Sequence, residues 1–344
     1  MLEWLHTVAS CAGWRGTYAG TAPTYQAKRK SNLTRSGEAM KATFIDCPPF
    51  LHELYQGELR AIVPDLEVNI GSPSPTEVVR LLDGSGFALN DHTTMSAALL
   101  EACPSLKAIV FLGTGAASYI DLAAAARLGI RVRAYGGYGD QSVAEHAIAL
   151  MFAAGRGIAR MDREIRAGRW EPLNGIELAG RTLGVIGIGG IGKAMVRLGA
   201  GLGMRVLAWN RSGVPDDLPA RAAELDDLLA QADVVSIHLV LNEDTRGFID
   251  RRRLGLLKPG AILINTARGA IVDEAALLEA LQDGRVGHAG LDVFALEPLA
   301  ADHPLARLPN VTLTAHAAFA TREASERLLR MALEILAEER RALG

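Results

Sequence analysis

The sequence is poor in cysteine, and its few cysteines form no recognisable motif. Cys11, Cys47 and Cys103 are odd in number and widely spaced, which argues against a disulfide framework. No Cys-x-x-Cys pair and no cluster of cysteine with histidine is present, so we expect no metal site. Such a chain is typical of a reducing compartment, and we expect a cytoplasmic protein.

Excess charge and long apolar runs are also missing. The 36 basic and 39 acidic residues give a formal net charge of −3, and there is no polybasic tail. The longest apolar candidate, residues 147–155 (AIALMFAAG), is far shorter than the roughly 18 residues needed to cross a bilayer. We therefore predict neither a nucleic-acid partner nor a membrane anchor.

Residues 1–39 differ from the rest of the chain. They are rich in basic, Ser and Thr residues, have only Glu3 and Glu38 as acids, and show no helical or strand periodicity. Three interpretations of this segment are possible: a transit peptide, a disordered leader, or a start codon assigned too far upstream. Met40 directly precedes an apolar run, which favours the last two, and we expect residues 1–39 to be dispensable for folding.

From Met40 onward, short β-rich runs alternate with helical stretches. The first series has runs at 42–46, 66–71, 86–90, 107–112 and 130–133, with helical stretches such as 95–103 and 119–128. One long helical stretch, 143–169, follows. The second series has runs at 182–186, 205–209, 233–237, 261–264, 287–291 and 311–314, and a final helical stretch begins at Thr321.

This alternation predicts two doubly wound α/β domains, each a parallel sheet with helices on both faces. A chain of 344 residues is long enough for two such domains. The glycine-rich stretch YGGYGD (135–140) before the long helical stretch is typical of a crossover or hinge.

A dinucleotide motif follows the first run of the second series. Gly187, Gly189 and Gly192 form Gly-x-Gly-x-x-Gly between an apolar run and a helical stretch. The glycines permit a tight turn, a close approach of backbone to pyrophosphate, and close helix–strand packing. The helix N-terminus then offers free N–H groups to the phosphates. A tight βα turn without a ligand is the alternative.

The next run ends in Asn210-Arg211-Ser212, where an NAD site would present a carboxylate to the ribose 2′-hydroxyl. The Arg211 guanidinium suits a 2′-phosphate instead, so we expect NADP to be preferred, with NAD possible. Arg211 could also be a solvated surface residue or stack on the adenine, which would serve both cofactors alike.

Three further residues follow apolar runs of the second series: Arg268, Glu297 and His316. The carboxyl ends of parallel strands form the ligand crevice of such sheets. A carboxylate clamp and an acid/base pair there are the predicted chemistry. Each residue also has a non-catalytic interpretation: Arg268 could cap a helix, Glu297 could be solvated, and His316 could be structural.

Together these motifs resemble the D-isomer-specific 2-hydroxyacid dehydrogenase family. The resemblance rests on VAEHAIALMFAAGR (143–156), GVIGIGGIGKA (184–194), INTARGAIVDEAAL (264–277), GLDVFALEP (290–298) and the His316 segment, in that order. It implies a Rossmann cofactor domain, 143–316, inserted into a split flavodoxin-like substrate domain, 40–142 plus 317–344. It also implies a homodimer formed mainly through the cofactor domains.

The resemblance implies a role for each site residue. Arg268 would bind the substrate carboxylate, His316 would protonate the keto oxygen, and Glu297 would hydrogen-bond the imidazole and favour its charged form. Cofactor contacts are assigned to Gly187, Gly189, Gly190, Ile191, Gly192, Asn210, Arg211, Ser212, His238, Thr266, Ala267 and Asp292. For His238 a purely structural role is at least as well supported as a contact near the adenine.

The substrate is less well defined, because the loop 113–118 (GTGAAS) departs from the family's usual Gly-x-Gly-x-Asp. Its small residues, Gly115 and Ala116 among them, can still present backbone N–H groups to an anion. We predict reduction of a small 2-keto acid of the glyoxylate or hydroxypyruvate type to the D-2-hydroxy acid. A 3-phosphoglycerate-dehydrogenase-like enzyme and a nucleotide-sensing, corepressor-like binding protein are the alternatives.

Overall fold

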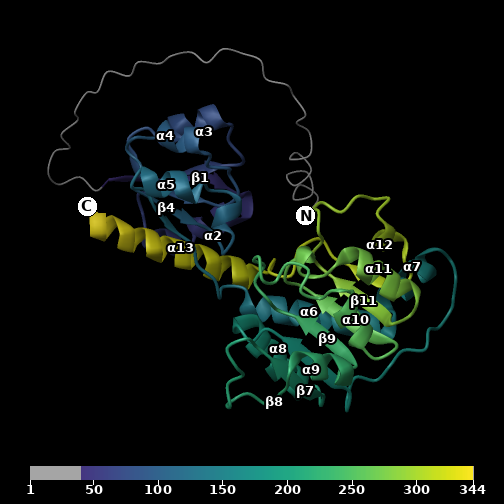
Figure 1. The fold of residues 1–344 in the computed structure, drawn as a ribbon. Coiled ribbons are helices and arrows are strands. Elements are labelled where there is room, and N and C mark those ends of the chain that lie inside the picture. Colours follow the sequence, from purple (N-terminus) through teal and green to yellow (C-terminus); the bar gives the residue numbers. More distant parts are fainter. Residues whose placement is uncertain (1–39, 344) are drawn as a thin grey trace.

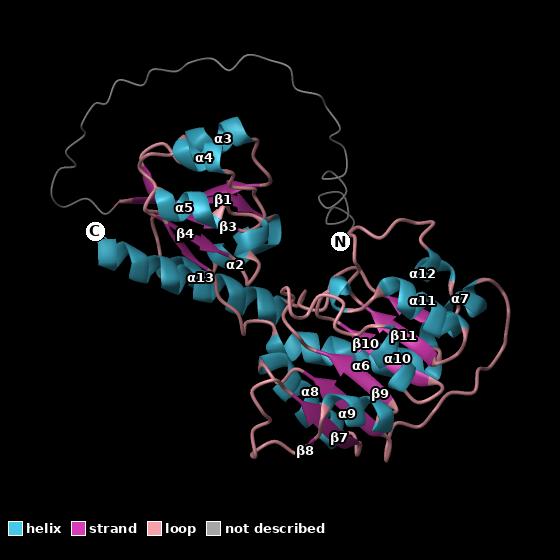
Figure 2. Cartoon of the chain, viewed as in Figure 1, coloured by secondary structure: helices cyan, strands magenta, loops and turns pink. Residues whose placement is uncertain are grey.

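A computed structural model describes residues 40–343 of the chain, so the expectations for residues 1–39 lie outside the described residues. Two parallel sheets, each enclosed by helices, make up the fold (Figures 1 and 2). Cys47 and Cys103 are buried free thiols. In the described part of the chain, no helix is long and apolar enough to cross a membrane.

The first sheet has five strands in the order β2-β1-β3-β4-β5. They are β1 (Lys41–Cys47), β2 (Glu67–Ile70), β3 (Ser85–Asn90), β4 (Ala108–Phe111) and β5 (Arg131–Arg133). The helices that accompany them are α2 (Pro49–Gln56), α3 (Pro75–Leu81), α4 (Ala97–Glu101) and α5 (Leu122–Arg127), with 3-10 turns η2 (Glu58–Ala61) and η3 (Ala116–Ser118). This order is the flavodoxin-like one, as predicted.

One face of the first sheet is covered by α2 together with α13 (Arg322–Leu343), the last helix of the described chain (Figure 1). The apolar positions Leu329, Leu333 and Leu336 of α13 follow helical spacing, and all are buried against this sheet. Helices α3, α4 and α5 contribute to the core on the opposite face.

The second sheet has seven parallel strands in the order β12-β11-β10-β9-β6-β7-β8. They are β6 (Thr182–Ile186), β7 (Arg205–Trp209), β8 (Arg221–Ala222), β9 (Val234–Ile237), β10 (Ala261–Asn265), β11 (Val286–Leu291) and β12 (Val311–Leu313). Counted from β6, the central strands follow the order of dinucleotide-binding sheets. The predicted fold class is therefore confirmed.

Helices enclose the second sheet as well. Its two cores include, on one side, α6 (Asp140–Arg156) and α8 (Gly190–Gly201), and on the other α9 (Leu225–Gln231), α10 (Arg251–Leu256) and α11 (Glu274–Gln282). The remaining elements are α7 (Ile158–Arg166), α12 (Pro304–Arg307) and the 3-10 turn η4 (Gly269–Ile271).

The single helical stretch predicted for 143–169 is wrong. The chain forms α6 and α7 instead, separated by Gly157, which adopts a left-handed conformation with φ 63°. That conformation carries little penalty for glycine and ends the helix. The predicted boundary between residues 142 and 143 falls inside α6, which begins at Asp140.

The chain crosses between the two sheets twice, and the two crossings lie side by side. Ser142 Oγ lies 2.9 Å from Thr321 Oγ1. Tyr135 donates its hydroxyl to the Leu328 carbonyl at 2.7 Å, and Arg327 Nε donates to the Tyr138 carbonyl at 2.8 Å. The first residues of α13 therefore hold the glycine-rich stretch 135–139 in place.

Candidate active site

The predicted acid/base pair is assembled. His316 follows β12 and Glu297 lies in the loop after β11, and His316 Nδ1 is 2.6 Å from Glu297 Oε2. The other carboxylate oxygen of Glu297 accepts the Phe294 backbone N–H at 2.8 Å. No described residue bonds His316 Nε2, so this nitrogen is the one left for a ligand. The pair can therefore hold a proton at Nε2 and orient it.

The electrostatics of Glu297 fit this role. Burial raises the pKa of the Glu297 carboxyl, but hydrogen bonds from His316 and the Phe294 amide outweigh burial and hold the pKa below its usual value. The positive charge of Arg268 acts in the same direction as these bonds. Glu297 is therefore a carboxylate at neutral pH, able to orient the His316 ring.

Arg268 is placed beside this pair by the turn after β10. Asn265 builds the turn: its side chain accepts the Ala267 N–H and donates to the Arg268 carbonyl, each at 3.0 Å. A Cβ on Gly269 would overlap the Phe294 backbone, so only glycine lets the two loops pack together. Arg268 is exposed, and within the described residues its hydrogen-bond partner is the adjacent Ala267 carbonyl, at 2.6 Å. Its guanidinium is thus largely free for a substrate carboxylate.

A buried carboxylate holds the His316 loop. Asp292 is fully buried, and its oxygens accept the N–H groups of Ala317 and Ala318, both at 2.9 Å, and the Thr314 hydroxyl at 2.6 Å. The Asp292 carbonyl accepts the His316 N–H at 2.8 Å. The Asp292 carboxylate therefore stabilises the loop that carries His316, and its place near the nicotinamide stays a prediction.

His316 itself adopts φ 50°, a left-handed conformation that is uncommon for a residue with a side chain. The bonds from the buried carboxylate to both sides of this residue hold it there. His146 on α6 also supports the His316 loop, because its Nε2 lies 2.9 Å from Thr314 Oγ1. His146 is not among the predicted site residues, although it lies in the 143–156 motif.

The glycine motif forms the expected turn. Gly187 follows β6 with φ 94°, and Gly189 caps α8. A Cβ on Gly192 would overlap the Gly187 carbonyl, so the third glycine lets helix and strand pack closely. Asn210 Oδ1 accepts the Ile188 N–H at 3.1 Å and so supports this turn from the end of β7. Gly190 and Ile191 are the first two residues of α8.

Two buried polar atoms without a hydrogen-bond partner lie just beyond the neighbouring strands β9 and β10. His238 follows β9, Thr266 follows β10, and the residues just before them, Ile237 and Asn265, are paired in register. His238 Nδ1 and Thr266 Oγ1 are both buried without a hydrogen-bond partner. Burial lowers the pKa of His238 to about 4, so it is neutral. Unpaired buried polar atoms beside the glycine turn fit a bound polar ligand such as a dinucleotide.

Arg211 is at the end of β7, with its side chain 79% exposed and 3.3 Å from the equally exposed Asp244. An exposed ion pair of this kind contributes little and leaves the guanidinium available. Asn210 Nδ2 donates to Ser212 Oγ at 2.8 Å, so Asn210 and Ser212 form one local network.

The predicted substrate loop follows β4 at the carboxyl edge of the first sheet. Gly115 precedes η3, in which Ala116 is buried. A Cβ on Gly113 would lie 3.5 Å from the Tyr138 hydroxyl, so this phenol reaches the loop. Burial raises the pKa of Tyr138 while the positive charge of Arg268 acts against it, which places the phenol in the field of Arg268. Tyr138 was missed because its stretch was interpreted only as a hinge.

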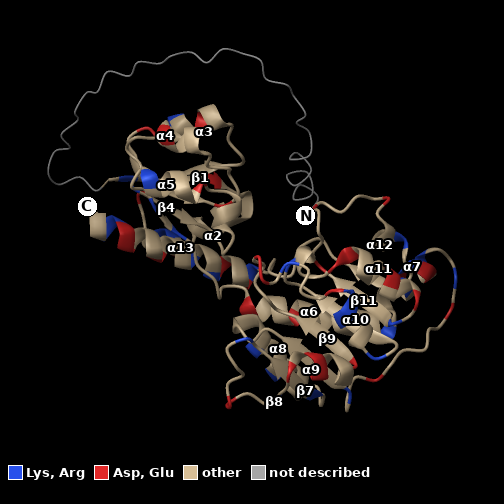
Figure 3. Ribbon diagram, viewed as in Figure 1, with Lys and Arg blue, Asp and Glu red and all other residues tan. Residues whose placement is uncertain are grey.

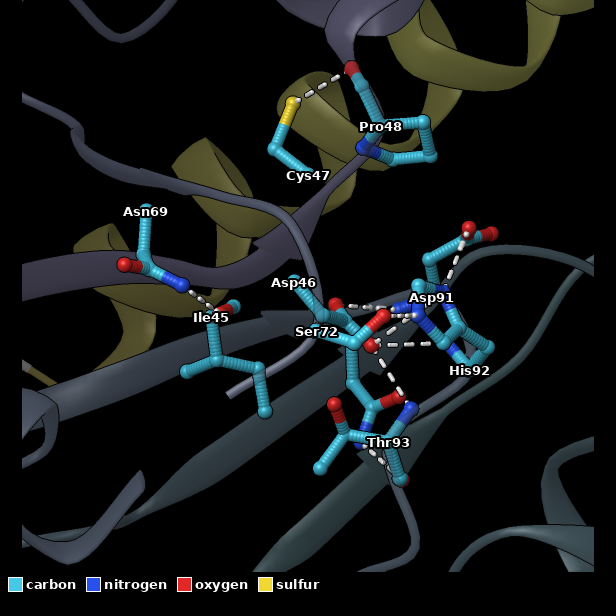
Figure 4. A network of polar contacts seen from close by, with 10 residues as sticks. Ile45, Asp46, Cys47, Pro48, Asn69, Ser72, Asp91, His92 and Thr93 are labelled. Carbon is cyan, nitrogen blue, oxygen red and sulfur yellow. Dashed lines mark hydrogen bonds and ion pairs between the residues drawn. The ribbon is translucent and has the colours of Figure 1, made fainter. Parts of the chain in front are cut away.

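A second polar network fixes the same edge of the first sheet (Figure 4). Asp46 at the end of β1 is fully buried and accepts the backbone N–H groups of Asp91, His92 and Thr93 at 2.9, 2.7 and 2.6 Å. His92 also lies 2.7 Å from Ser72 Oγ. The loop after β3 is thereby held next to the β4 loop, because Asn90 pairs with Phe111 in register.

The fold and the glycine turn define an α/β protein with a dinucleotide-type sheet, and comparison with known proteins gives its family. Residues 148–318 match the model of the D-isomer specific 2-hydroxyacid dehydrogenase, NAD binding domain. Over 250 residues the chain is 41% identical to the glyoxylate reductase of Aeropyrum pernix, covering 69% of this chain and 74% of that relative. The chain belongs to the D-isomer specific 2-hydroxyacid dehydrogenase family, as the motifs predicted.

Two further comparisons mark the range of the family. The D-3-phosphoglycerate dehydrogenase of Mycobacterium leprae is 38% identical over 286 residues, covering 80% of this chain and 53% of the relative, so the chain spans about half of that relative's length. The apo structure of D-lactate dehydrogenase from Escherichia coli superposes with a TM-score of 0.79 at 28% identity, covering 88% of this chain and 98% of that chain.

Proposed function

We propose that this protein reduces a small 2-keto acid to the D-2-hydroxy acid with a nicotinamide dinucleotide. The observation that carries the proposal is the His316–Glu297 pair beside the free guanidinium of Arg268. Arg268 would bind the substrate carboxylate, and His316 Nε2 would protonate the keto oxygen, with Glu297 orienting the ring. The bound cofactor would supply the hydride.

We further propose that the second sheet and its helices bind the cofactor, and that the first sheet with α13 binds the substrate. The glycine turn, with Gly187, Gly189 and Gly192, supports the first assignment. Tyr138 supports the second, because its hydroxyl lies next to the β4 loop and in the field of Arg268. Gly115 and Ala116 would then face the substrate anion with backbone N–H groups.

Turnover tests this function directly. Initial rates with glyoxylate, hydroxypyruvate and 3-phosphohydroxypyruvate, each with NADH and NADPH, should show measurable kcat/KM for the two unphosphorylated acids. A clear preference for the phosphorylated acid would instead support the 3-phosphoglycerate-dehydrogenase-like alternative. Tight cofactor binding without turnover of any acid would support the corepressor-like binding protein.

We expect NADPH to be the better cofactor because of Arg211. A hydrogen bond to a charged group contributes about 1.5–3 kcal/mol, which corresponds to roughly tenfold to over a hundredfold in affinity. The exposure of Arg211 places the effect toward the lower end. In Arg211→Ala, kcat/KM with NADPH should fall by about tenfold, while kcat/KM with NADH stays nearly constant.

The matched control is Asp244→Asn, which removes the partner of Arg211 and leaves the guanidinium in place. It should keep the NADPH preference. A native chain that prefers NADH would refute this proposal, and so would an equal loss with both cofactors in Arg211→Ala.

We also propose a homodimer, with α7 and the segment after it in the contact. Helix α7 has no buried residue, and Ile158, Ile165 and Trp170 are 50%, 55% and 85% exposed. Ile158 and Ile165 are seven positions apart and so lie on one face of α7, and exposed apolar surface of this kind is typical of an interface. Light scattering should give twice the mass of one chain, and Ile165→Glu should shift the equilibrium toward the monomer. A monomeric native chain would contradict the proposal.

Absence of a nucleic-acid partner stays a prediction. The balanced composition supports it. Figure 3 shows Lys and Arg interspersed with Asp and Glu over both parts of the fold.

A further inference from the structure

Asp140 places a carboxylate beside the glycine turn. It is the first residue of α6, directly after the glycine-rich crossing 135–139. A Cβ added to Gly190 would overlap the Asp140 carboxylate, so this carboxylate packs on the first residue of α8. A side chain at position 190 would therefore have to displace this carboxylate, which comes from another helix.

The negative charge of Asp140 has little compensation from neighbouring groups. No described residue donates a hydrogen bond to it, and the Asp140 side chain is partly buried. Burial raises the pKa of Asp140, and the positive charge of Arg327 on α13 acts in the opposite direction. Arg327 is itself tied to the Tyr138 carbonyl, so it does not close on Asp140 as a hydrogen-bonded partner. The other charged groups nearest along the two helices are Glu145 on α6 and Lys193 on α8.

The first turn of α8 is where a pyrophosphate would bind. Its N–H groups have no carbonyl partner within the helix, and the helix dipole places positive potential there. Asp140 directs its own negative charge at the same turn. Both groups are negative, and with the strong screening of a turn open to solvent we expect their repulsion to cost roughly threefold to tenfold in affinity.

The geometry points to Asp140 as a residue that weakens the binding of every pyrophosphate-bearing nucleotide to the α8 turn. This inference rests on the proposed function, because it assigns the turn to a dinucleotide. Both nicotinamide dinucleotides share the pyrophosphate, so Asp140 would lower affinity for both without changing the choice that Arg211 makes. The consequence would be faster release of the spent cofactor, and product release limits turnover in many enzymes.

Direct binding to the full chain tests the role of Asp140. Calorimetric titration of Asp140→Asn with NADH, NADPH and ADP-ribose should give a Kd about threefold to tenfold lower than in the native chain for all three. Raising the salt concentration should bring the Kd values of Asp140→Asn and the native chain closer together, because salt screens the repulsion between exposed charges. Asp140→Ala is the second variant, and it should show the same tightening if the charge is what matters.

Glu145→Gln is the matched control. It makes the same charge change on the same helix, but Glu145 is exposed and bonded by Gln141 at 2.7 Å. Its Kd values should equal those of the native chain. Unchanged affinity in both Asp140 variants would overturn the inference. Weaker binding would overturn it too, since Asp140 would then be an acceptor for cofactor hydroxyls.

The two levels of proposal fail in different ways. If the chain binds dinucleotides and the Asp140 variants tighten them, but no 2-keto acid is turned over, the inference stands and the proposed reaction falls. If 2-keto acids are turned over and the Asp140 variants bind the nucleotides as the native chain does, the proposed reaction stands and the inference about Asp140 falls. Failure of every variant to bind any of the three nucleotides would remove both.

Discussion

His316→Ala should lower kcat for reduction of a 2-keto acid by about 10²–10⁴-fold, the usual contribution of a positioned general acid. Without the imidazole, the keto oxygen has no proton donor at Nε2, while Glu297 keeps its bond to the Phe294 amide. The Kd for the cofactor should change little, because the glycine turn and the ends of β6 and β7 are untouched. Steady-state rates and a cofactor titration measure the two effects.

His303→Ala is a suitable control for that substitution. His303 Nε2 also contacts a glutamate, Glu274, at 3.1 Å, but it caps α12 away from the loop after β12. Its loss should leave kcat close to that of the native chain. A His316→Ala chain with near-normal turnover would remove His316 from the mechanism.

Arg268→Lys should lower kcat/KM for any 2-keto acid by roughly tenfold to over a hundredfold. Lysine keeps the charge but loses the planar fork that matches a carboxylate with two hydrogen bonds. Because Asn265 and Gly269 set the turn independently of the Arg268 side chain, the loop should keep its shape. Rates across a range of substrate concentrations give kcat and KM separately.

Arg307→Lys provides the comparison, since Arg307 is an exposed arginine on α12. It should leave kcat/KM unchanged. If Arg268→Lys behaves like Arg307→Lys, Arg268 does not bind the substrate carboxylate and the proposed clamp is wrong.

Much of the fold could be predicted because it depends on local patterns. Each buried strand is an apolar run bounded by turn residues, and β6, for example, was predicted within its observed limits of Thr182–Ile186. The alternation of strands and helices then leaves few topologies. The break at Gly157 could not be predicted, because apolar spacing continues past it and only the left-handed backbone shows it.

The site was predictable to the same extent. Arg268, Glu297 and His316 each follow an apolar run, and the carboxyl ends of neighbouring parallel strands converge. The supports behind them were not predictable. The contact of His146 with Thr314 spans 168 positions, and the contact of Asp140 with Gly190 joins two helices, so neither leaves a local pattern in the sequence. Such contacts depend on how α6 packs.

The shared covering of the first sheet by α13 has a consequence for biosynthesis. Strands β1–β5 leave the ribosome well before α13, so the sheet face that carries Phe44, Phe87 and Leu89 lacks α13, and has only the cover of α2 and its neighbours, while the whole second sheet is being made. The second sheet is built from one continuous stretch and can fold during translation. The order of maturation is then opposite to the order of synthesis, and the nascent first sheet is the part that a chaperone would bind.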